Sequence, residues 1–194
     1  EEEKVDEQTL EKQEAVVQND ATSPKAVTGA TIYIDGAAGS NTANGDSETT
    51  AVKTLDKAIE LAGEGGTIIV TGTKPVIINT DITLDNNITV TRDAGQASAD
   101  SMLMVRDGGS LTINHATLDG GGFANSGSLV FVRSRSLTIN EGAVIRNNVG
   151  RSEVIYAEAY TGTETKIEMN GGEICNNNVD QAIVAIYSWA FQDE

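Results

Sequence analysis

The chain has 194 residues, a formal net charge of −16 and one cysteine, Cys175. This length suffices for a substantial hydrophobic core, and a single cysteine excludes an intramolecular disulfide. Because the acidic excess repels phosphate groups, neither nucleic acid nor a membrane surface is expected as a partner. An acidic polysaccharide would need a local basic patch or bound cations on this surface.

Residues 1–28 are polar, with eight acidic residues and three lysines, and we expect them to form a flexible acidic leader. Residues 29–66 follow as an N-terminal unit, with a short strand at 30–35 and a polar loop up to residue 49. Val52, Leu55, Ile59 and Ala62 then recur at helical spacing. The glycines at 63, 65 and 66 predict the end of this helix.

Residues 67–194 consist of short β-rich runs separated by Gly, Asn and Asp. The runs are four or five residues long in most cases, and none shows helical periodicity. We predict strands at residues 67–70, 76–78, 81–84, 88–91, 102–105, 110–113, 128–132, 136–139, 154–156, 166–169 and 182–186.

One block occurs three times without gaps, at residues 111–122, 137–148 and 167–178, with offsets of 26 and 30 residues. Such a period is typical of solenoid coils. The alignment predicts three inward rows, namely Leu111, Leu137, Ile167; Ile113, Ile139, Met169; and Leu118, Val144, Ile174.

Aligned asparagines mark one corner of these coils. Asn114, Asn140 and Asn170 predict an amide ladder, in which each side chain bonds the one above and below. Asn147 and Asn177 suggest a second ladder. A propeller blade is too long for this repeat, and a leucine-rich repeat would need a leucine signature and helices. A β-sandwich fits single segments but does not explain the repeat, so the sequence predicts an all-β solenoid, a parallel β-helix.

Several segments resemble the pectin-lyase-like β-helix of adhesin-like surface proteins from Gram-positive gut bacteria. They are 33–36 (YIDG), 50–59 (TAVKTLDKAI), 65–70 (GGTIIV), 111–114 (LTIN), 117–121 (TLDGG) and 170–174 (NGGEI). The resemblance spans roughly residues 30–187. It implies a right-handed parallel β-helix with three sheets, in which the helix near residues 52–62 caps the N-terminal end. Because lyases, hydrolases and adhesins share this fold, function has to come from a site.

The enzyme motifs of such folds are poorly matched. Asn79, Thr80 and Asp81 spell one element of a polygalacturonase pattern, but the paired aspartates and the Gly-His-Gly element are missing. His115, the single histidine, is expected to be an exposed turn residue. Cys175 is expected to face outward and to be inert. A lyase-like site would need calcium-binding carboxylates beside an arginine or lysine base, and Asp107 and Asp119 are the carboxylates to consider.

The best candidates for a binding site follow neighbouring strands of the predicted solenoid. Arg106 and Arg133 come after equivalent strands in successive coils, and Glu158 and Tyr160 fall one coil further on. An exposed ladder of charge pairs would explain this row without a ligand. Arginine beside tyrosine also suits sugars and acidic groups. The predicted binding residues are Arg106, Asp107, Arg133, Arg135, Glu158 and Tyr160, with no catalytic residue and no metal ligand among them.

The polar loop at 35–48 resembles a calcium loop only loosely, so the sequence requires no cofactor and leaves Ca²⁺ open there. Residues 182–191 begin a further coil before the sequence stops at Glu194. We therefore expect a solenoid that is truncated at its C-terminus, with self-association through the open end as an alternative.

The sequence favours a non-catalytic extracellular binding module, adhesin-like and either secreted or attached to the cell wall. Its expected partner is a glycan or a host surface protein. The alternative is a fragment of a polysaccharide lyase or hydrolase that acts on uronic-acid polysaccharides. A third reading, a structural stalk with no ligand, predicts no binding to glycans or host proteins.

Overall fold

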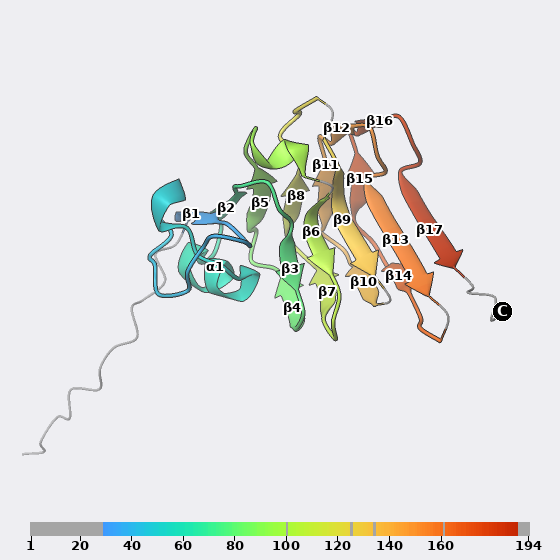
Figure 1. Cartoon of the computed structure of the whole chain (residues 1–194), viewed down its shortest axis with the longest axis horizontal. Coiled ribbons are helices and arrows are strands. Elements are labelled where there is room, and N and C mark those ends of the chain that lie inside the picture. The colour runs from blue at the N-terminus through green and yellow to red at the C-terminus, as the bar shows by residue number, and fades with distance from the viewer. Residues whose placement is uncertain (1–28, 100, 125, 134, 161, 190–194) are drawn as a thin grey trace, which may run out of the picture.

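The computed structural model describes residues 29–99, 101–124, 126–133, 135–160 and 162–189. The predicted acidic leader at residues 1–28 lies outside the described residues. In the described part the chain winds through successive coils whose strands stack into three parallel sheets, with a fourth short pair at one corner (Figure 1).

The first sheet has six strands in the order β1-β2-β5-β8-β11-β15. These are β1 (Thr31–Ile34), β2 (Thr67–Val70), β5 (Thr89–Arg92), β8 (Thr117–Asp119), β11 (Val144–Arg146) and β15 (Glu173–Cys175).

The second sheet, with the order β3-β6-β9-β13-β17, carries the residues that matter most below. Its strands are β3 (Val76–Ile78), β6 (Ser101–Val105), β9 (Ser128–Arg133), β13 (Ile155–Tyr160) and β17 (Val184–Trp189). The third sheet consists of β4 (Asp81–Leu84), β7 (Ser110–Ile113), β10 (Ser136–Ile139) and β14 (Lys166–Met169). The corner pair is β12 (Val149–Gly150) and β16 (Asn178–Val179).

Every described strand pair is parallel, and the four coils that begin with β2, β5, β8 and β11 each contribute one strand to each of the three sheets. The predicted right-handed parallel β-helix is thereby confirmed. The strands follow one another along the long axis of the molecule from the N-terminal end to β17 (Figure 1). Below, coil 2 means β5-β6-β7, coil 3 means β8-β9-β10, and coil 4 means β11 to β14.

The interior is built from rows of apolar side chains that occupy equivalent positions in successive coils. Leu111 pairs in register with Ile82 of the preceding strand and with Leu137 of the following one. All three are buried. Since parallel strands stack about 4.8 Å apart, such rows fill the solenoid continuously.

Helix α1 (Leu55–Ala62) covers the N-terminal end of the solenoid (Figure 1). The helix residues Leu55, Ala58 and Ala62 are buried, whereas Ile59 of the same helix is only partly buried. Val52 is buried too, but it precedes the helix and forms a parallel bridge with Ile34. The predicted capping helix is confirmed. It begins at Leu55, later than predicted, and it ends before Gly63, as predicted.

The asparagine ladder is confirmed and runs further than predicted. Asn170 Nδ2 donates to Asn140 Oδ1 at 3.0 Å, and Asn140 Nδ2 donates to Asn114 Oδ1 at 2.9 Å. Asn114 in turn donates to Asp85 Oδ2 at 3.1 Å, so a carboxylate ends the row at the first coil. The ladder joins four successive corners of the β-helix.

Two details of the repeat alignment are wrong. Ile145, not Val144, pairs with Leu118 and Ile174 and points inward. The reason is a corner of four residues (140–143) before β11, against three (114–116) before β8.

The predicted second ladder is also absent, because its two asparagines have other partners among the described residues. Asn147 donates to both carboxylate oxygens of Asp119, at 3.1 and 3.0 Å. Asn177 accepts from the backbone N–H of Asn148 and donates to the carbonyl of Ile145.

One corner encloses a charged side chain. Arg92 is 2% exposed and donates to the carbonyls of Gly127 and Ser128, at 3.4 and 3.1 Å. Asn148 also donates to the Gly127 carbonyl, at 3.1 Å. Arg92 has no ion-pair partner in the described part of the chain, and burial lowers its pKa to about 10. The guanidinium therefore stabilises this corner through backbone carbonyls alone.

The side chains of the last described coil are more exposed than those of the coils before it. Ile183, Val184, Ile186 and Tyr187 are all exposed apolar or aromatic residues there, and so is Met169 at the end of β14 in the coil before. No helix in the described ranges is long and apolar enough to cross a membrane.

Candidate functional site

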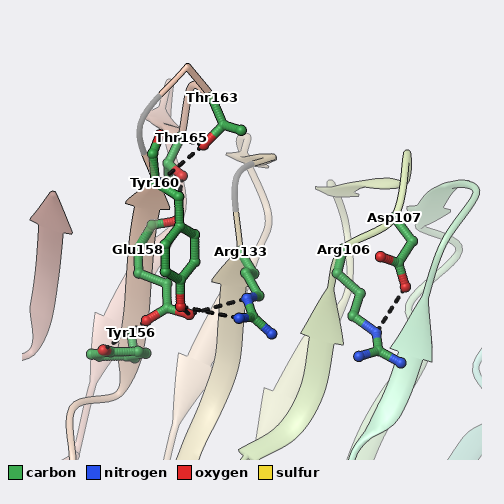
Figure 2. A network of polar contacts seen from close by, with 8 residues as sticks. All are labelled: Arg106, Asp107, Arg133, Tyr156, Glu158, Tyr160, Thr163 and Thr165. Atoms are coloured by element: carbon green, nitrogen blue, oxygen red, sulfur yellow. Dashed lines mark hydrogen bonds and ion pairs between the residues drawn. The ribbon is translucent and has the colours of Figure 1, made fainter. Parts of the chain in front are cut away.

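A notch of about 810 Å³ lies at the corner between the second and third sheets. It arises from unequal turn lengths. Two residues (134–135) join β9 to β10 in coil 3, whereas four (106–109) and five (161–165) make the same connection in coils 2 and 4. The short turn is thus flanked by two longer ones. Figure 2 shows Thr163 and Asp107 on the longer turns, with Arg133 between them.

The notch gathers cationic side chains on an acidic protein. It is lined by Asp81, Arg106, Asp107, Gly108, Gly109, Ser110, Arg133, Arg135, Ser136, Gly162, Thr163, Glu164 and Lys166. Four of these residues are cationic and three are acidic, while the whole chain has 13 cationic and 29 acidic residues. The lining of the notch therefore carries one net positive charge, in a chain of net charge −16.

Its central cation, Arg133, is held in place by the next coil. Arg133 pairs in register with Glu158, and its Nε lies 3.3 Å from Glu158 Oε1. Its Nη2 donates to the Tyr160 hydroxyl at 3.1 Å, and the guanidinium lies 5.0 Å from the centre of the Tyr160 ring. The cation thus contacts both the hydroxyl and the π face of one tyrosine.

Glu158 anchors this network, since both of its oxygens accept hydrogen bonds. Tyr160 donates to Oε1 at 2.6 Å, and Tyr156 donates to Oε2 at 3.2 Å. Glu158 is only 7% exposed. Burial, and then the negative charge of Glu158, raises the pKa of Tyr156 to about 12. Figure 2 shows the three side chains along β13, with Arg133 reaching toward them from β9.

The other two arginines of the notch are less constrained. Arg106 Nε lies 3.0 Å from Asp107 Oδ2, but this ion pair is not aligned as a hydrogen bond. Figure 2 shows it apart from the Arg133 network. Arg135 is exposed, and no ion-pair partner for it exists among the residues described. Arg135 is therefore the cation most available to a ligand.

The structure brings all six predicted binding residues to this corner, in two roles. Arg106, Asp107, Arg133 and Arg135 line the notch. Glu158 and Tyr160 do not line it but bind the Arg133 guanidinium from the neighbouring strand β13. Asp119 does not belong here, because it lies on the first sheet and pairs with Arg146 at 2.9 Å.

Sequence reasoning missed Lys166 and Tyr156. Lys166 pairs in register with Ser136 and lines the notch, while also forming an ion pair with Glu168 at 2.9 Å. Tyr156 pairs with Phe131. Both lie in predicted strands, so their place followed from the repeat once the strands were stacked in register.

The polar residues of the 35–48 loop mainly bond one another and the start of α1. Asn41 Oδ1 accepts from the backbone N–H groups of Lys53 and Thr54, and Asp46 accepts from the Thr50 hydroxyl at 2.6 Å. In the described part of the chain, no group of three or more His, Cys, Asp or Glu side chains is placed to hold a metal ion. Calcium binding at this loop stays a prediction.

The remaining candidates lie elsewhere. His115 is exposed, and its Nδ1 lies 3.2 Å from Asp85 Oδ1 at the corner ladder. Cys175 is partly buried and pairs in register with Arg146. Neither residue lines the notch.

We compared the chain with protein-family models, with curated proteins and with solved structures, and none of them matches.

Proposed function

We propose that this protein is a non-catalytic, adhesin-like binding module of the bacterial cell surface and that its notch binds an acidic glycan. The pectin-lyase-like family is proposed on the segments quoted above together with the β-helix. The observation that carries the function is the gathering of four cationic side chains, Arg106, Arg133, Arg135 and Lys166, around one hollow of a strongly acidic chain.

Electrostatics favour an acidic ligand at this corner. The rest of the surface repels anions, so a polyanion gains by approaching the notch and loses by lying anywhere else. Arginine is well suited to this contact, since its planar guanidinium can hold a carboxylate or sulfate through two hydrogen bonds.

Preorganisation supports binding as well. Glu158 and Tyr160 already fix the Arg133 guanidinium, so little side-chain entropy is lost when a ligand contacts it. The exposed Arg135 beside it supplies a cation that no described acidic group neutralises. Serine hydroxyls at Ser110 and Ser136 offer neutral hydrogen-bond partners for sugar hydroxyls.

Calorimetric titration with an oligogalacturonate, and with a neutral 1,4-linked glucan of equal length, tests this function. We expect binding of the acidic chain only. The variant Arg135→Ala should bind it at least about tenfold more weakly. Arg146→Ala makes the same charge change on the first sheet, where Arg146 pairs with Asp119, and should bind like the unmodified protein.

Three results would overturn the proposal. The first is equal binding of the neutral glucan, and the second is equal weakening by Arg135→Ala and Arg146→Ala, which would indicate a general charge effect. The third is the release of new reducing ends or of unsaturated products during incubation, which would identify a hydrolase or a lyase.

A further inference from the structure

A second, smaller hollow lies at the opposite end of the same strand. It measures about 170 Å³ and is lined by Gly127, Ser128, Phe131, Arg151, Ser152 and Tyr156. Gly127 and Ser128 stand at the start of β9, whereas Arg133, at the end of β9, reaches the notch. Coil 3 therefore carries a hollow at each end of its strand in the second sheet. We call the smaller one the aromatic pocket.

The aromatic pocket combines ring faces with ordered hydroxyl groups. The rings of Phe131 and Tyr156 meet edge to face, with centroids 4.9 Å apart and planes at 64°. Ser128 is 2% exposed, and its hydroxyl lies 3.3 Å from that of Ser152, which donates to Glu153 Oε2 at 2.7 Å. Aromatic walls with a few fixed polar groups match the apolar face and polar edge of a sugar ring.

The far wall of the aromatic pocket, at Ser128, is separated from the notch by the length of β9, whereas its near wall, Phe131, is two residues from Arg133. Ser128 and Arg133 are five residues apart, which corresponds to roughly 17 Å along a strand. Phe131 and Arg133 both lie on the outer side, because the residue between them, Val132, is buried. A single sugar cannot reach both hollows, whereas a short oligosaccharide can.

The lengths of the turns around the notch favour a ligand that runs along β9 over one that runs across the coils. The longer turns at 106–109 and 161–165 flank the short turn of coil 3, so a chain leaving the notch across the coils would have to pass over one of them. The direction along β9 leads over Arg133 and Phe131 to the aromatic pocket. Tyr160 and Tyr156 border that path from the neighbouring strand β13.

We propose that the aromatic pocket is a second subsite that holds the ring of a further sugar unit of the same glycan, which lies along β9 with another acidic unit in the notch. This inference rests on the proposed function. It adds the direction of the ligand, a minimum length greater than a disaccharide, and a role for Phe131, Tyr156, Ser128 and Ser152 in holding a sugar ring.

A length series of oligogalacturonates tests the proposal, with affinities measured by calorimetry for the unmodified protein and for Phe131→Leu. The unmodified protein should bind a tetrasaccharide at least about tenfold more tightly than a disaccharide. Phe131→Leu keeps an apolar side chain and removes the ring. It should bind the disaccharide equally well and lose most of the gain with length.

Met104→Leu is the matched control, since Met104 pairs in register with Phe131 one coil earlier and is similarly half-buried. Met104→Leu should keep the whole gain in affinity from the disaccharide to the tetrasaccharide. Arg151→Ala, at the exposed rim of the pocket, should lose part of the gain even if Phe131→Leu folds poorly.

The outcomes separate the two proposals. If neither length of glycan binds, the proposed function fails and this inference fails with it. If both lengths bind equally, or if Phe131→Leu and Arg151→Ala both keep the gain, the function stands and the second subsite is refuted. If Met104→Leu loses as much as Phe131→Leu, the ligand runs across the coils and the proposed direction is wrong.

Discussion

Arg133 Nε lies 3.3 Å from Glu158 Oε1, across the boundary between two coils of the β-helix. The pair is unequal, because the arginine side chain is 45% exposed while the carboxylate side chain is 10% exposed. The buried partner acts as the anchor and the exposed partner faces the notch. Because of this asymmetry, the ion pair holds the Arg133 guanidinium in one position, where a ligand in the notch can contact it.

Replacing Glu158 with Gln should loosen that anchor. The variant keeps the shape of the side chain but removes the charge that Arg133 and two tyrosine hydroxyls contact. We expect the free energy of unfolding in urea to fall by about 1–2 kcal/mol. Glu164→Gln, on the exposed rim of the notch, should cost almost nothing. Equal losses in both variants would show that Glu158 has no anchoring role.

The corner ladder predicts a graded series of losses. Asn140 takes part in two amide hydrogen bonds of the ladder, whereas Asn170 donates in one. At roughly 0.5–1.5 kcal/mol for each hydrogen bond, Asn140→Ala should destabilise the protein about twice as much as Asn170→Ala. Urea unfolding measures both. An equal loss in the two variants would contradict the ladder as a source of stability.

The buried arginine should matter more than an exposed one. Arg92→Ala removes the guanidinium donor from the carbonyls of Gly127 and Ser128, and among the described residues only the Gly127 carbonyl keeps a side-chain donor, Asn148. We expect a loss of about 2–3 kcal/mol in the free energy of unfolding. Arg146→Ala breaks a partly exposed pair with Asp119 and should cost at most about 1 kcal/mol. The prediction fails if Arg92→Ala is the milder variant.

The raised pKa of Tyr156 predicts that the protein loses stability in alkali. Its pKa rises from 10.0 to about 12 on folding, so the unfolded state releases the phenolic proton first. Stability from the neutral phenol is complete below pH 10.0 and is lost as the pH rises from 10.0 to about 12. Tyr156→Phe should lose less stability over this interval, as followed by urea unfolding at a series of pH values. Parallel curves for the two proteins would refute the assignment.

Much of the fold follows from the sequence, because inward side chains must repeat from coil to coil. The row that contains Leu111 and Leu137 and the amide ladder of Asn114 and Asn140 both appear as predicted. Several strands, such as Thr67–Val70 and Ser110–Ile113, also have their predicted bounds. Each of these features depends only on apolar alternation and on the polar residues of the corners.

Corner lengths were harder to predict than strands. An ungapped alignment placed Val144 in the interior, and the extra corner residue before β11 moved Ile145 there. The sequence carries no signal for this shift, since Val144 and Ile145 suit an inward position equally well. The register of the neighbouring strands decides between them.

The candidate site was predictable as a row but not as a hollow. The sequence placed Arg106, Arg133 and Glu158 in successive coils, and the register of β9 and β13 confirms the contact of the last two. The notch itself depends on the turn lengths of three coils. The aromatic pocket depends on a pair of rings brought together from β9 and β13.

Hydrogen exchange on the complex with an oligogalacturonate tests the central claim most directly, because it locates the ligand. We predict slower exchange at the turns 106–109 and 162–165 and at the end of β9, with no change on the outer face of the first sheet. Protection on the first sheet around Asp119 and Arg146, or no protection anywhere under saturating glycan, would contradict the account.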